Sequence, residues 1–99
     1  MFIAMNHFDV EPSRNEEFEK VWKERDSYLD EVPGFVRFAL LRGDEPGRYI
    51  SHSTWESREA FQAWTKSEAF RKAHAGARMP EGVLLGHPQV RTYQSVIPS

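Results

Sequence analysis

The amino-acid sequence predicts an α+β fold in which strands and helices follow the order βαββαβ. Three observations carry this prediction: four short segments of strand character, a helical stripe with boundary signals after the first of them, and a second helical unit split in two before the last. This order is the ferredoxin-like arrangement, in which helices cover one face of an antiparallel sheet. We expect a single domain over residues 1–99.

The expected elements follow one another without a repeat, a linker or a low-complexity tract. Strands are expected at 2–8, 35–42, 48–55 and 89–96. Helices are expected at 14–31, 57–65 and 68–74, and a loop punctuated by glycine and proline is expected at 76–88.

The first helix has signals at both ends. Ser13 and Glu16 have the spacing of a capping box and follow Pro12, while Pro33-Gly34 stops the helix, because proline disfavours helical backbone in the residue before it.

Apolar residues within this helix form a stripe that we expect to be buried, namely Phe18, Val21, Trp22 and Leu29. Arg25 falls on the same stripe, seven residues after Phe18. Two interpretations stay open for it. Either its stem packs while its head reaches solvent, or its guanidinium meets an anionic partner in a pocket.

The strands indicate assembly, because both faces of the first two are apolar. In 35–42, one predicted face carries Phe35, Ala39 and Leu41, and the other carries Val36, Phe38 and Leu40. Helices can cover only one face of the sheet, so the other needs a second sheet. We therefore expect a homodimer in which two subunits form an α+β barrel.

Composition excludes several classes of function. The net charge is -2 and no run of lysine or arginine occurs, which argues against nucleic acid as a partner. The chain has no cysteine, so thiolate chemistry is excluded. No stretch has the length of a membrane span or the pattern of a signal peptide, and the expected location is cytoplasmic. No P-loop or G-x-G-x-x-G sequence is present, so electrons for any redox reaction would come from outside the chain.

Three residues need a particular explanation. Asn6 lies within the first strand among apolar neighbours, where its amide either makes a local hydrogen bond or points into a cavity. Trp64, taken alone, fits a position in the core better than a position in a site. His74 comes one turn after Phe70 on the same helix face, where it packs, caps the helix or binds a metal such as haem iron.

Taken together, these residues give the chain a resemblance to the IsdG-type haem-degrading monooxygenases, within the antibiotic-biosynthesis-monooxygenase-like superfamily. The resemblance covers residues 1–96 and includes P-G-F at 33–35 and S-T-W-E-S at 53–57. Its specific part is the combination of Asn6, Trp64 and His74, in which His74 follows Trp64 by ten positions.

The resemblance implies a role for each residue. His74 would bind the haem iron, Asn6 would hydrogen-bond a distal ligand such as oxygen, and Trp64 would press on the porphyrin plane and ruffle it. Haem would be both cofactor and substrate, O2 would be consumed, and an external electron donor, a separate reductase, would supply electrons. Further residues expected at the cofactor are Trp22, Phe70, Arg25, Arg71 and Arg78, the three arginines as partners of the propionates.

Three alternatives stay open from the sequence. One is a cofactor-free monooxygenase that acts on an aromatic or quinol substrate in the same fold. Another is a non-enzymatic module that binds or senses haem. The third is a dimeric domain whose function lies in a partner protein.

Overall fold

The computed structural model of the chain describes residues 1–25, 29–75 and 79–97, without the side chains of residues 74 and 75. The strands are β1 (Phe2–Asp9), β2 (Phe35–Arg42), β3 (Arg48–Trp55) and β4 (Gln89–Gln94). The α-helices are α1 (Asn15–Glu24), α2 (Arg58–Thr65) and α3 (Glu68–Ala75), with short 3-10 helices at Pro12–Arg14 and Leu29–Glu31.

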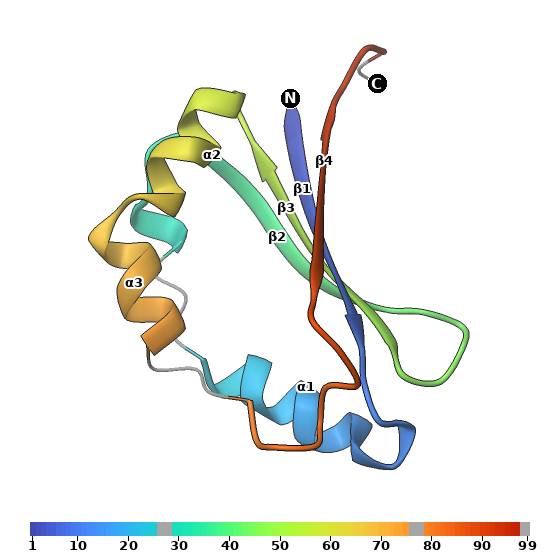
Figure 1. Cartoon of the computed structure of the whole chain (residues 1–99). Coiled ribbons are helices and arrows are strands. Elements are labelled where there is room, and N and C mark those ends of the chain that lie inside the picture. The colour runs from blue at the N-terminus through green and yellow to red at the C-terminus, as the bar shows by residue number, and fades with distance from the viewer. Residues whose placement is uncertain (26–28, 76–78, 98–99) are drawn as a thin grey trace.

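The four strands form one antiparallel sheet in the order β2-β3-β1-β4. All three α-helices lie on the same side of this sheet (Figure 1). The ferredoxin-like α+β fold predicted from the sequence is therefore confirmed. The predicted bounds of β2 and β3 are also those of the structure.

The first helix is shorter than predicted. It ends at Glu24, and Arg25 has extended backbone with ψ of 133°, so the expected helix over 14–31 is wrong at its C-terminal end. Leu29 begins a separate 3-10 helix. Arg25 and Leu29 therefore do not continue the helical stripe of Phe18 and Trp22.

The predicted capping box is also wrong. Pro12–Arg14 form a 3-10 turn, which makes Arg14 rather than Ser13 the residue that precedes α1. The Ser13 hydroxyl instead donates to Glu11 at 3.3 Å. The first turn is held by Arg14, which forms a 2.8 Å ion pair with Glu17.

A bulge changes the faces of β2. Phe35 pairs with Trp55 and Phe38 pairs with Ser53, with an irregular register between Phe35 and Arg37. The extra residue at Val36 brings Phe35 and Phe38 to the same sheet face, whereas strict alternation had placed them on opposite faces.

The core consists of two separate clusters on the helix-covered face. One contains Phe8, Val10, Phe18, Tyr49 and Val83, and the other contains Phe2, Leu29 and Trp55. Phe18 and Leu29 thus pack in different clusters, although the sequence pattern had joined them in one stripe. The chain must pass from one cluster to the other between these residues, which explains why α1 does not continue to Leu29.

The opposite sheet face has no helix against it within the described part of the chain (Figure 1). Its central strands carry Ile3, Met5 and Ile50 together with His52, and the exposed side chains of Leu41 and Tyr93 extend its apolar part. This is the face that we predict to be covered by a second subunit. No helix of the described residues is long and apolar enough to cross a membrane.

Candidate functional site

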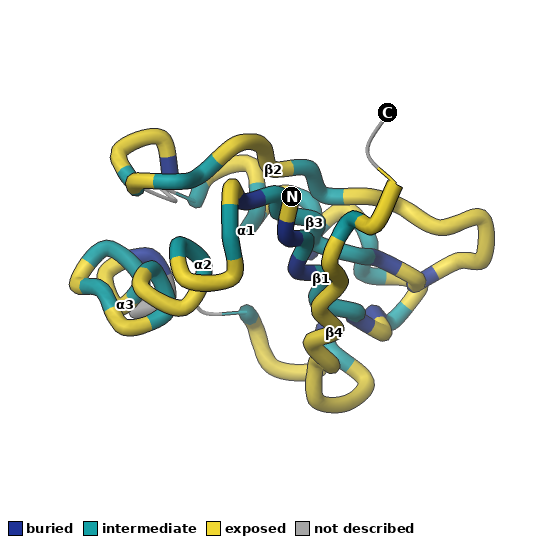
Figure 2. The backbone as a smooth tube through the Cα atoms, turned by 90° about the horizontal axis from the view of Figure 1, so that it is seen from above, coloured by how far each residue is buried: buried dark blue, intermediate teal, exposed yellow. Residues whose placement is uncertain are grey.

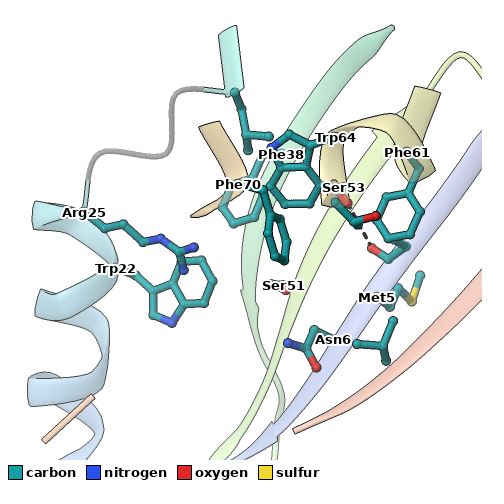
Figure 3. Close-up of a pocket in the computed structure, with 14 residues that line it drawn as sticks. Met5, Asn6, Trp22, Arg25, Phe38, Ser51, Ser53, Phe61, Trp64 and Phe70 are labelled. Carbon is teal, nitrogen blue, oxygen red and sulfur yellow. Dashed lines mark hydrogen bonds between the residues drawn. The ribbon is translucent and has the colours of Figure 1, made fainter. Parts of the chain in front are cut away.

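Seen from above, α2 and α3 lie on one side of the strands (Figure 2). A pocket of about 330 Å3 lies between the sheet and the helices (Figure 3). The two core clusters occupy the ends of the helix-covered face, and both contribute partly buried aromatic residues to the lining: Trp22 from one, Phe61 and Trp64 from the other. The pocket is therefore the space that the two clusters leave between them.

The floor of the pocket consists of small or polar side chains. Ala4 pairs with Ser53 and Asn6 pairs with Ser51 across β1 and β3, so these residues form one patch of the sheet. Ser53 has partners, because it accepts from the Trp55 indole at 3.0 Å. Asn6 differs, because its Oδ1 atom is buried and has no hydrogen-bond partner among the described residues.

One wall is built from α1 and the edge strand β2. The indole of Trp22 stacks on Phe38 with ring centroids 5.7 Å apart and planes 19° apart. The guanidinium of Arg25 lies over the same indole, 4.5 Å from its centroid (Figure 3).

The opposite wall comes from α2 and α3. Ser57 caps α2 by accepting from the Ala60 amide, and Ser67 joins the two helices by accepting from the Phe70 amide at 3.1 Å. The Ser67 hydroxyl also donates to the Trp64 carbonyl at 2.6 Å. This junction sets the rings of Trp64 and Phe70 edge to face, with centroids 4.8 Å apart.

Arg25 is the charged residue of the pocket lining, and burial lowers its pKa. Its Nε atom is buried without a hydrogen-bond partner among the described residues, as is the Nε1 atom of Trp22. Buried polar atoms are normally paired, so unpaired ones beside a pocket point to a ligand or to bound water. With Asn6, three of the described lining residues have such an atom, and no carboxylate is among the described residues of the lining.

The structure brings together five of the residues predicted from the sequence, namely Asn6, Trp22, Arg25, Trp64 and Phe70. His74 belongs to α3, one turn after Phe70, but its side chain lies outside the described residues. Arg71 is exposed on α3 and does not line the pocket, and Arg78 lies outside the described residues.

Several lining residues were not singled out from the sequence, notably Phe38, Phe61 and Ser51. The bulge in β2 hid the orientation of Phe38. A signal was present for the floor, because Ser51 and Ser53 alternate along β3 and leave room where larger residues would fill the cavity. Among the described residues, no group of three histidine or acidic side chains could hold a metal ion by itself.

The fold and the pocket define a ferredoxin-like α+β protein with an aromatic-walled cavity on the helix-covered face of its sheet. The chain belongs to the antibiotic biosynthesis monooxygenase family, whose model matches residues 1–76.

Relatives with haem-related names are found by sequence and by structure. The chain is 40% identical over 79 residues to "Heme oxygenase (mycobilin-producing)" of Mycobacterium tuberculosis strain H37Rv, which covers 77% of this chain and 72% of the relative. It is 52% identical over 73 residues to "Heme-degrading monooxygenase" of Shouchella clausii, covering 71% of this chain and 64% of that protein.

The structure of the heme-degrader MhuD from Mycobacterium tuberculosis, with two hemes bound in its active site, superposes with a TM-score of 0.79. The two proteins are 32% identical, and the match covers 100% of this chain and 99% of MhuD. These comparisons confirm the resemblance to the IsdG-type haem-degrading monooxygenases.

Proposed function

We propose that this protein is a haem-degrading monooxygenase that binds haem in the pocket and opens the porphyrin ring oxidatively, which releases iron. The observation that carries the proposal is the pocket itself, an apolar aromatic cavity lined by Asn6, Trp22 and Arg25, each of which has a buried polar atom without a hydrogen-bond partner among the described residues. The names of the relatives support the same function.

The residues present fit haem chemically. A large apolar macrocycle suits the aromatic walls of Trp22, Trp64 and Phe70, and a cation suits its carboxylate substituents. We assign the iron ligand to His74, because it lies four residues after Phe70 in the same helix. When bound, haem supplies both the iron that activates O2 and the carbon that is oxidised.

Asn6 orients the oxygen in this proposal. Its side chain lies on the sheet floor and lines the cavity (Figure 3), and its buried Oδ1 atom has no hydrogen-bond partner among the described residues. A side chain held in a strand loses little freedom when it makes a hydrogen bond during the reaction. The amide would therefore affect the rate of turnover more than the affinity for haem.

Trp64 shapes the macrocycle in this proposal. Its indole is fixed from two sides, by Trp55 at 5.2 Å and by Phe70 at 4.8 Å between ring centroids. A ring held in this way cannot yield easily, so a planar ligand pressed against it would bend instead. Such bending directs oxidation to one edge of the porphyrin.

The proposal includes a homodimer, a separate reductase as electron donor, and a cytoplasmic location. The apolar face that no described helix covers supports the dimer. The absence of a nucleotide-binding motif in the sequence supports an external source of electrons.

A haem titration followed by reduction tests the proposal. We expect haemin to produce a Soret band that saturates at one equivalent per chain, and ascorbate with O2 to bleach that band and release iron to a chelator. Absence of a Soret shift would contradict haem binding and favour a cofactor-free oxygenase. If haem binds but neither ascorbate nor a reductase causes the Soret band to bleach, the result would favour a haem-sensing module.

A further inference from the structure

Trp22 is held in place more firmly than a typical pocket residue. Its indole stacks on Phe38, lies under the Arg25 guanidinium, and receives Phe8 edge-on at 5.8 Å between centroids with planes 73° apart. Phe18 adds a fourth contact at 6.3 Å. These neighbours come from α1, β1 and β2, so the indole connects the helix to the sheet.

A second cavity lies directly behind this indole. Its volume is about 250 Å3, and its lining also includes Leu40, Tyr49 and Lys23 together with the ion-paired Glu19 and Arg42. Trp22 and Phe38 line both this cavity and the candidate site, and they are the two residues that the two linings share. The stacked pair is therefore a partition between the two cavities.

We propose that the Trp22–Phe38 partition sets the capacity of the site at one planar tetrapyrrole per chain. This inference rests on the proposed haem-binding function. MhuD, which is 32% identical, has been observed with two hemes in its active site, so the fold itself does not limit the number to one. In this chain, a second macrocycle would need space that the partition closes.

The partition acts as a fixed wall because of its surroundings. A lone aromatic side chain can rotate away from an incoming ligand, but rotation of Trp22 would break contacts with Phe8, Phe18 and Phe38 together. Truncation of either partner removes the wall and joins cavities of about 330 Å3 and about 250 Å3.

The experiment measures stoichiometry rather than activity. Wild type, Trp22→Ala, Phe38→Ala and the control Phe35→Ala are titrated with haemin and, separately, with metal-free protoporphyrin IX. Phe35 lies on the same strand as Phe38 but lines neither cavity, so the control makes the same truncation away from the partition. Difference absorbance and native mass spectrometry count the bound ligands.

We expect one equivalent per chain for wild type and Phe35→Ala, and two equivalents, a twofold increase, for Trp22→Ala and Phe38→Ala. If either partition variant fails to fold, the other still decides the outcome, and Trp22→Phe gives a smaller change at the same position. Two equivalents in wild type, or one in every folded partition variant, would overturn the inference. Failure of wild type to bind either tetrapyrrole would instead contradict the proposed function.

Discussion

Replacing Arg25 with methionine tests whether the pocket recognises a carboxylate of its ligand. The guanidinium lies 4.5 Å from the Trp22 centroid, and its Nε atom is buried without a partner among the described residues. Methionine keeps an unbranched apolar stem against the indole and removes only the charge and the donors. The substitution therefore separates recognition of a carboxylate from packing.

The expected loss follows from the type of interaction. A hydrogen bond to a charged group contributes roughly 1.5–3 kcal/mol. At about 1.4 kcal/mol per factor of ten, Arg25→Met should weaken haem binding roughly 10-fold to 150-fold. Burial lowers the pKa of Arg25 but leaves it charged at neutral pH, so the loss should not depend on pH between about 6 and 9.

The assay compares two ligands. Dissociation constants are measured by fluorescence quenching for haem and for its dimethyl ester, in which both propionates are neutral. We expect the full loss with haem and less than about a fivefold change with the ester, since a cation–π contact contributes roughly 0.5–1 kcal/mol. An equal loss with both ligands would refute the reasoning and leave Arg25 with a packing role alone.

The remaining predictions concern the iron ligand, turnover, assembly and stability. His74→Ala should abolish the wild-type ferric haem spectrum, and an unchanged spectrum would mean that another residue is the ligand. Asn6→Ala and Trp64→Ala should both slow the single-turnover decay of the Soret band, with a much smaller change in haem affinity. For Asn6→Ala, loss of the amide hydrogen bond should slow the decay roughly 5-fold to 100-fold. If a variant loses rate and affinity equally, the residue only lines the pocket. Sedimentation at micromolar concentration should give about twice the chain mass of 11.5 kDa, and a stable monomer would contradict the dimer. Tyr49→Phe should lower the free energy of unfolding in urea by about 1–2 kcal/mol near pH 7, because the phenol donates to Glu19 at 2.5 Å. This hydrogen bond is the main cause that lowers the pKa of Glu19, so its contribution is present above the unfolded-state pKa of about 4.3 and is lost as the pH falls through the lower folded-state pKa. A Tyr49→Phe deficit that persists at pH 2 would contradict this assignment.

The sequence by itself determined the order of the helices and strands. It also named five residues that line the pocket in the structure. The strand bounds of β2 and β3 were correct because their ends are marked by proline, glycine and charged residues around apolar segments. Asn6 was recognised because an amide is unusual within a strand. Helical spacing placed Trp22 and Trp64 on buried helix faces, and only the family resemblance assigned them to a site, which stays a prediction.

Only the tertiary structure decided where the first helix ends and how the faces of β2 are arranged. Helical spacing joined Phe18 and Leu29 in one stripe, but periodicity reports only that a residue is buried, not which cluster it joins. The bulge at Val36 likewise depends on pairing with β3, which no local pattern contains. The pocket exists because the two core clusters do not meet, and because the sheet residues between them, such as Ala4, Ser51 and Ser53, are too small to fill the space. The sequence also could not show that Asn6, Trp22 and Arg25 each have a buried polar atom without a partner among the described residues, because segments distant in sequence bury these atoms.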